Sequence, residues 1–332
     1  MPAIPLGTLA QSMVARHAQT RIQSDLTKLS MELTTGLTQD VGAATRGDTR
    51  ALTALTRQID ELNAYGTARA EASLTARSTQ TALSSMQDRL LHVQDGVIAL
   101  AQAQNPTQHQ IVAEQARNAF AGVIGDLNMQ SAGRSLFCGT ALNGPATRGA
   151  DAILADIAAA VSGVATPSDL TAAIDAYFAP GGAFEANDYL GSTTDSQPIR
   201  IGPQDRAAPT LRADDTAIRD TLKTLATLAV LPDTALSGAA KQLAVDASLD
   251  QVINSKRGLI EVQSRVGATE ARIEIAASRS AGARAAYETA RLDTLAVDPY
   301  ATATRLQETQ TQLETLYTLT ARLSGLNLVN FL

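Results

Sequence analysis

The chain has 332 residues, of which 45% are hydrophobic, and a formal charge of -6 at pH 7. It is therefore long enough for two or more domains and apolar enough for a folded core. The acidic balance argues against a protein that holds nucleic acid by bulk electrostatics, which needs a basic face. Aromatic residues make up only 3% and tryptophan is absent, which favours long helices with thin apolar seams over a thick globule.

The residues that could support catalysis or metal binding are few and scattered. A single cysteine, Cys138, excludes an intramolecular disulfide and any multi-cysteine metal site. His17, His92 and His109 lack metal-ligand spacing, and we expect them at solvated helix positions. The acidic pair at positions 214–215 precedes an apolar helical pattern and predicts a helix start. We therefore predict no enzyme, no catalytic residue, no cofactor and no metal.

The N-terminal sequence gives no export or membrane signal. No basic residue precedes Arg16, and no continuous apolar stretch follows Met1, so we expect no cleavable signal peptide. A membrane-spanning helix needs about 18 or more apolar residues in a row, and we expect no membrane insertion. A protein of this kind that acts outside the cell would be exported by a route that does not read such a signal.

The first predicted helix covers roughly residues 9–35, and Gly36 is well placed to end it. A second helix is predicted from about 52 to 104, because Leu62 and Leu83 lie three whole heptads apart in one register, although Arg69 falls on the seam. Asn105 and Pro106 then predict the cap and first turn of a further helix.

The strongest repeat lies in the C-terminal half, where every seventh residue from Val245 to Tyr287 follows one line and a companion series follows three residues later. Together they predict the apolar seam of a coiled coil. Such a helix, from Val245 to Ala290, would be roughly 70 Å long at about 1.5 Å per residue. Asp298 and Pro299 predict its end and the start of a terminal helix.

The segment between the two halves is richer in Gly, Pro, Asp and Ser and has no heptads. It predicts short helices at 152–162 and 168–178, a turn at 180–182 and a strand at 199–201. The predicted fold is mainly α: a long antiparallel helical rod, a coiled-coil-like bundle built from both termini, with a small inserted α+β domain. The predicted domains are residues 1–40 with 299–332 (terminal assembly), 41–140 with 210–298 (helical rod) and 141–209 (outer insertion).

The first and last helices each carry an apolar stripe, and this predicts a role in assembly. The two stripes either pair within one chain as an ordinary coiled coil or face neighbouring subunits. Isolated thin helices are marginal in water, which favours subunit contact. The predicted interface residues are Ile22, Leu26, Leu29, Leu33, Leu306, Leu313, Leu316, Leu323, Leu326, Phe331 and Leu332.

A row of three arginines, Arg265, Arg272 and Arg279, repeats every seven residues beside the C-terminal seam. The row predicts a basic line along the helix, either as a solvated face with acidic neighbours on the same helix or as a lateral contact with an acidic face of another subunit.

Several segments resemble one known family. The segment Gly133-Arg134-Ser135-Leu136-Phe137-Cys138-Gly139-Thr140 is similar to the Gly-x-x-Leu-Phe-small-Gly-Thr element of bacterial hook-associated protein 3, the hook-filament junction family of the flagellin superfamily. The leucine-rich helix that closes on Gly36 and the Val266-Gly267 element also resemble that family. So does the ending from Asp298-Pro299-Tyr300-Ala301 to Asn327-Leu328-Val329-Asn330-Phe331-Leu332.

The resemblance implies paired terminal helices that line an axial tube, and a structural adapter between the hook end and the flagellin filament. The implied partners are further copies in a ring, flagellin, hook-associated protein 1 and an export chaperone, and the implied location is the extracellular flagellum. Within the family, the alternative is flagellin itself. A hypothesis from another class is an intracellular coiled-coil scaffold or signalling rod that merely shares the heptads.

Overall fold

The computed structural model describes residues 6–103, 106–141, 143–208 and 211–329; at 6–9, 11–12, 101–103, 106–108 and 323–329 it describes the backbone only. The chain divides into two compact units. Unit 1 comprises Met1–Leu62 and Ala281–Leu332, and unit 2 comprises Asn63–Ser280.

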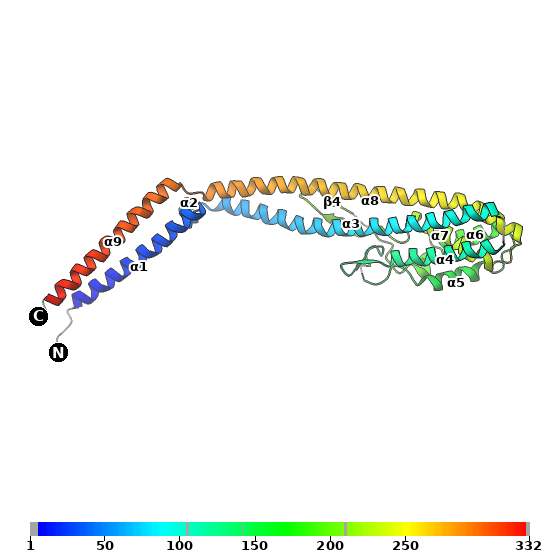
Figure 1. Cartoon of the computed structure of the whole chain (residues 1–332), viewed down its shortest axis with the longest axis horizontal. Coiled ribbons are helices and arrows are strands. Elements are labelled where there is room, and N and C mark those ends of the chain that lie inside the picture. Colours follow the sequence, from blue (N-terminus) through cyan, green and yellow to red (C-terminus); the bar gives the residue numbers. More distant parts are fainter. Residues whose placement is uncertain (1–5, 104–105, 142, 209–210, 330–332) are drawn as a thin grey trace, which may run out of the picture. The chain divides into compact units, whose positions relative to one another are not determined.

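Unit 1 joins the two ends of the chain. Helix α1 (Leu6–Thr35) packs against helix α9 (Pro299–Val329), and the two ribbons lie side by side in Figure 1. The predicted C-cap is confirmed, because Gly36 has a φ of +72° and its N–H donates to the carbonyl of Glu32 at 2.8 Å. The predicted start of α9 is also confirmed, because Asp298 Oδ1 accepts a hydrogen bond from the N–H of Tyr300 at 2.9 Å.

Short helix α2 (Val41–Ala44) follows α1 and leads into helix α3 (Arg50–Ala103), whose first residues belong to unit 1. The Asp40 carboxylate begins α2 by accepting a hydrogen bond from the N–H of Ala43. This bond, followed by the Lys28 ammonium at 3.5 Å, lowers the pKa of Asp40. The prediction of one helix up to about residue 104 is confirmed by α3, which is uninterrupted through Gly66 and Arg69.

Helices α3 and α8 (Gly238–Leu295) run antiparallel in unit 2. The Gln80 side chain donates to the carbonyl of Gln263 at 2.9 Å, and Arg69 Nη1 donates to Ser280 Oγ at 2.8 Å. The predicted heptad seam of α8 is buried over most of its length, at Val245, Val252, Leu259, Val262, Val266, Ile273, Ala276 and Ser280.

The seam tolerates Arg69 because its charge is directed to polar partners. Besides Ser280, Arg69 Nη1 donates to the carbonyl of Ile201 at 2.9 Å. Burial lowers the pKa of Arg69. A small apolar cluster beside it contains Ala72, Ile201, Ala207, Ile273 and Ala276. The arginine thus links α3, α8 and the segment around residue 201.

The remaining helices of unit 2 share one apolar core with residues 76–100 of α3 and residues 244–266 of α8. These helices are α4 (Pro106–Leu127), α5 (Ala150–Val161), α6 (Pro167–Phe178) and α7 (Thr216–Val230), and α7 contacts the other three. The predicted helices at 152–162 and 168–178 are confirmed as α5 and α6. Asn105, which we predicted to cap α4, lies outside the described residues.

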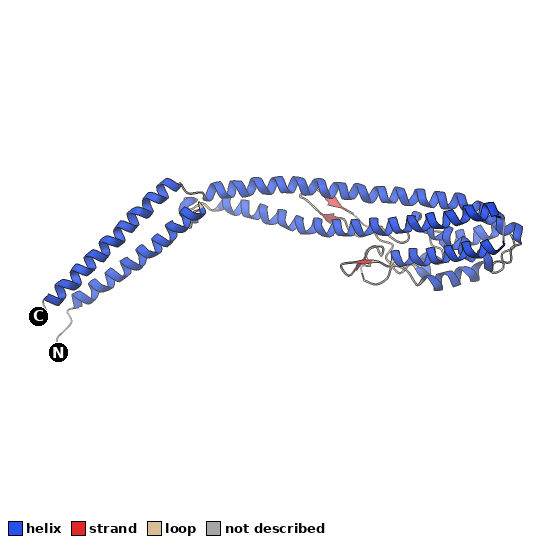
Figure 2. Ribbon diagram, in the orientation of Figure 1, coloured by secondary structure: helices blue, strands red, loops and turns tan. Residues whose placement is uncertain are grey.

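Two small hairpins complete unit 2 (Figure 2). Strands β1 (Gln130–Ser131) and β2 (Arg134–Ser135) pair antiparallel across Ala132 and Gly133, which both have positive φ; such a two-residue turn fits the twist of a hairpin. Strands β3 (Ile199–Arg200) and β4 (Arg206–Ala207) form the second hairpin, which confirms the strand predicted near residue 199. Two short turns, η1 (Phe184–Asp188, π-helical) and η2 (Leu231–Asp233, 3₁₀), lie between the helices.

The mainly α fold, with long antiparallel helices and a small inserted α+β region, is confirmed. The division into three domains drawn from the sequence stays a prediction. Within the described ranges, no helix is long and apolar enough to cross a membrane.

Replacement of Arg69 by alanine tests the polar link in the seam. The variant leaves the Ser280 hydroxyl and the Ile201 carbonyl without this donor, and we expect the free energy of unfolding to fall by about 1–3 kcal/mol. Urea unfolding followed by circular dichroism measures the change. Arg77→Ala, at an exposed position of the same helix, is the control; equal stability of the two variants would contradict the assignment.

Candidate assembly surface

The predicted interface residues of α1 and α9 lie mainly where these helices meet. Leu26 and Leu306 line one open hollow, and Leu29 lines another beside Ala301 and Thr302. Burial within the chain is incomplete, because two helices cover only one side of each stripe. The half-buried members are Ile22, Leu26, Leu29, Leu306, Leu313 and Leu316.

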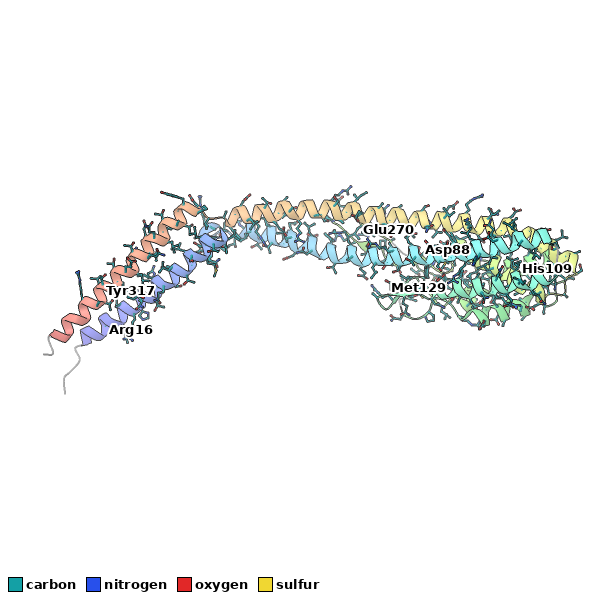
Figure 3. The ribbon with its side chains drawn as sticks, viewed as in Figure 1. Arg16, Asp88, His109, Met129, Glu270 and Tyr317 are labelled. Carbon is teal, nitrogen blue, oxygen red and sulfur yellow. The ribbon has the colours of Figure 1, made fainter. Side chains whose placement is uncertain are left out.

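Tyr317 adds a polar contact to the pair (Figure 3). The side-chain amides of Gln19 and Gln23, four residues apart on α1, both donate to the Tyr317 hydroxyl at 3.3 Å. Neighbouring residues at this spacing share one helix face. The contact therefore fixes which face of α1 is turned towards α9.

Other apolar side chains of unit 1 point away from the pair. Leu33, predicted as an interface residue, is 39% exposed. Other apolar side chains on both α1 and α9 are also exposed. A contiguous exposed apolar surface is a typical sign of a contact with another protein. These side chains include Met13, Val14, Met31 and Leu319.

The structure does not describe the side chains of four predicted interface residues. Leu323 and Leu326 belong to α9, but the structure describes only their backbone. Phe331 and Leu332 lie outside the described residues. Their role in the interface stays a prediction.

A clasp between two loops closes the base of the α1 and α9 pair. The N–H of Thr38 donates to the carbonyl of Leu295 at 2.8 Å, and the N–H of Val297 donates to the carbonyl of Gly36 at 3.0 Å. These two bonds form an antiparallel bridge between Leu37 and Ala296. The chain therefore enters and leaves the helix pair through one hydrogen-bonded point.

The Glu32 carboxylate stabilises the clasp through hydrogen bonds to the residues that follow Leu37. Glu32 is only 7% exposed, and its Oε1 accepts hydrogen bonds from the N–H of Gln39 at 2.8 Å and the hydroxyl of Thr38 at 3.3 Å. Hydrogen bonds satisfy a carboxylate that would otherwise be costly to bury. We did not predict this role. Glu32 and Gln39 lie on either side of Gly36, where the helix ends, so no helical period relates them.

The three arginines of the basic row differ in their surroundings. Arg265 pairs with Asp215 at 3.3 Å and Arg279 with Asp205 at 3.7 Å. Arg272 is exposed and, in the part of the chain that the structure describes, has no ion pair. The counter-charges therefore come from Asp205 and Asp215, which lie in the segment between β3 and α7. For a solvated face we expected acidic neighbours on α8 itself.

Cys138 is a buried side chain. Its Sγ lies 2.8 Å from Ser135 Oγ, and burial raises the pKa of the thiol. A thiol with a raised pKa is a poor nucleophile. Gly139, next in sequence, has a φ of +62°, and a Cβ there would lie 2.5 Å from the Thr194 carbonyl oxygen. This close approach explains a glycine at the position.

Two acidic side chains, Asp215 and Asp188, have structural partners. Asp215 begins α7 by accepting a hydrogen bond from the N–H of Ala217, which confirms the predicted helix start. Asp188 is buried and accepts from the Tyr177 hydroxyl at 2.5 Å and Arg148 Nη1 at 2.8 Å. Burial raises the pKa of Asp188, which the Tyr177 hydrogen bond and the Arg148 charge oppose.

The histidines are not clustered. His17 and His92 are exposed as expected, whereas His109 is partly buried, and burial followed by the Lys241 charge lowers its pKa. Among the described residues, no group of three His, Cys, Asp or Glu side chains is arranged to hold a metal ion.

These features define a class of protein: a helical chain whose two ends form a common unit with a partly uncovered apolar surface. The model of the bacterial flagellin N-terminal helical region matches residues 6–141, and that of the bacterial flagellin C-terminal helical region matches residues 249–332. The chain therefore belongs to the flagellin family, which comprises structural proteins of the bacterial flagellum. The superfamily resemblance drawn from the sequence is confirmed.

Solved structures share the fold. A protein from Vibrio parahaemolyticus described as a flagellar hook-associated protein is 14% identical, with a TM-score of 0.54 over 75% of this chain and 99% of that chain. FlgL of Bacillus cereus is also 14% identical, with a TM-score of 0.51 over 72% of this chain and 100% of that chain. No curated sequence matches significantly.

The clasp gives a first prediction for unit 1. Glu32→Ala removes the acceptor of the Gln39 amide, and we expect amide hydrogen exchange at Thr38, Gln39 and Val297 to accelerate at least about tenfold, since such a bond to a charged group contributes about 1.5–3 kcal/mol. Glu314→Ala, at an exposed site of α9, is the control. Unchanged exchange in Glu32→Ala would refute the supporting role.

The apolar stripe gives a second prediction, built on two leucines one helical turn apart. Leu29→Ala should weaken the α1 and α9 pair by about 1–2 kcal/mol, because Leu29 is half-buried. Leu33→Ala should change it by less than about 0.5 kcal/mol, yet lower incorporation into sheared surface flagella if its exposed side chain faces another subunit. Hydrogen exchange of α1 and sedimentation of sheared flagella measure the two effects. Normal incorporation of Leu33→Ala would remove Leu33 from the interface.

Proposed function

We propose that this chain is a structural adapter of the bacterial flagellum, which joins a hook-associated protein at the hook end to the flagellin filament. The observation that carries the proposal is unit 1, in which both family regions meet and still present uncovered apolar side chains. The fold likeness to two hook-associated structures, over nearly their whole length, favours an adapter within the family.

The adapter would bind through its terminal helices. Its partners are further copies of itself in a ring, flagellin on one side and hook-associated protein 1 on the other, with a chaperone during export. Each apolar stripe is narrow, so affinity comes from many weak contacts repeated around the ring. The protein would act outside the cell as part of the flagellum.

The basic row would contribute a lateral contact between subunits. Arg265, Arg272 and Arg279 all lie on one line of α8, and Arg272 is the member with no ion pair among the described residues. Its guanidinium is therefore free to meet an acidic group of a neighbour, while the other two also hold the segment that follows β3.

Flagellin, the filament subunit, is the second candidate, and the two matching family regions favour it directly. A filament subunit and an adapter share the terminal helix pair, so the pair does not separate them. They differ in what a cell loses when the gene is absent.

Deletion of the gene separates the candidates. For an adapter, we expect intact hooks without filaments, loss of motility and flagellin released into the medium, because export continues but the filament has nothing to attach to. Electron microscopy and immunoblots of medium and cells measure these outcomes, and complementation with the unmodified gene is the control. Absence of flagellin from both fractions would favour the filament subunit; normal filaments would reject both structural roles.

A further inference from the structure

The basic row of unit 2 has a matching acidic row on another helix. Asp88 and Asp95 lie seven residues apart on α3, and both are exposed. In the part of the chain that the structure describes, neither has an ion pair. The nearest cation in sequence, Arg89, is bound to Asp126 at 3.2 Å. The two carboxylates therefore leave a local negative charge on the outer face of α3.

This outer face carries a shallow, open hollow, and its described lining residues all belong to α3. Asp88, whose position is labelled in Figure 3, lines the hollow together with Asp95. Leu91, which is 38% exposed, adds an apolar contact beside them. The seam residues Leu83 and Leu90 point elsewhere, because they are fully buried. Arg89, which is paired with Asp126, and His92 line the hollow as well. The hollow thus combines two carboxylates that have no ion pair among the described residues with apolar surface.

The two rows have the same spacing. Seven residues of an α-helix span about 10.5 Å, so Arg272 and Arg265 are separated along α8 by the same distance as Asp88 and Asp95 along α3. Because α3 and α8 run in opposite directions, a helix α8 from a second copy in the same orientation would bring Arg272 to Asp88 and Arg265 to Asp95 together. Such a contact uses different faces of the two copies and is heterologous.

We propose that α8 of one copy docks on the outer face of α3 of the next, with Arg272 paired to Asp88 and Arg265 close to Asp95. The inference rests on the proposed function for the shared orientation of the copies. It names the acidic partner surface, which is a second copy of this chain. Ile275, which is 52% exposed next to Arg272, supplies an apolar contact at the same site.

The register within one chain predicts how the copies are displaced. Gln263 accepts hydrogen bonds from the side-chain amides of both Gln80 and Gln87, so it lies between them along α3. Arg272 follows nine residues later on an antiparallel helix and is therefore level with about residues 71–78 of α3. Asp88 lies roughly 15–25 Å further along α3 at about 1.5 Å per residue. Copies docked in this way would be staggered lengthwise by that amount, so the ring of the proposed function would follow a helical path rather than close in one plane.

A disulfide experiment tests the docking directly. A chain carrying both Arg272→Cys and Asp88→Cys cannot link these positions internally, because their lengthwise separation exceeds the Cα distance of about 7 Å that a disulfide allows. On flagellated cells treated with a mild oxidant, we expect dimers and higher multimers on non-reducing gels. The matched control pairs Asp88→Cys with Ser278→Cys, another exposed position of α8. Equal yields from the two pairs would overturn the proposal.

Charge reversal tests the same contact without a cross-link. Arg272→Asp should lower the number of attached filaments about fivefold or more, because the loss at one exposed pair repeats around the assembly. The double variant Arg272→Asp with Asp88→Arg should recover most of them, since each copy then carries the swapped pair. Arg257→Asp, at an exposed site of the same helix, should behave as the unmodified chain. Failure of the double variant to recover filaments would overturn the pairing.

The outcomes separate this inference from the proposed function. Restoration of filaments to the deletion strain by the unmodified gene is required by the adapter role and is measured first. If that restoration occurs and the Arg272 and Asp88 positions do not cross-link above the control, only the docking geometry is wrong. If the deletion strain builds normal filaments without the gene, the adapter role itself is wrong.

Discussion

A pair of helices can cover only one side of each other, and this limit governs unit 1. The leucines between α1 and α9 stay half-buried, and apolar side chains such as Met31 and Leu319 remain exposed. Burial stabilises a structure roughly in proportion to the apolar area removed from water. The terminal pair therefore has less to hold it together than unit 2, where several helices surround Phe120, Phe137 and Phe184.

In unit 2 the constraint is one of register, because two long helices that contact through an apolar seam can pack in more than one lengthwise alignment. Polar groups at single seam positions are an established way to fix register. Here Arg69 binds Ser280 across the seam and the Ile201 carbonyl beside it, while Gln80 binds the Gln263 carbonyl. These bonds form at one alignment of α3 and α8. The lengthwise position of every surface residue, including the charged rows, depends on that alignment.

Heptad spacing and end signals made the long helices predictable. The repeat through Val245 and the seam through Leu83 gave α8 and α3, while Gly36 and Asp298 gave ends close to the observed ones. Contacts between residues distant in sequence were not predictable in this way. Three such contacts depend on the path by which loops return to the helices: the burial of Glu32, the clasp at Leu37 and the pairing of Arg265 with Asp215. The periodic spacing of residues in the sequence does not predict that path.

The contact between the chain's two ends also has a kinetic consequence. Gln19 and Tyr317 are 298 residues apart in sequence, and closing so large a loop costs conformational entropy before any contact repays it. Once unit 2 has formed, however, its long helices already bring the two segments back towards one place, and the effective loop becomes short. Folding of the middle is thus the step that makes pairing of the ends fast, and a chain with an unfolded middle would have free ends.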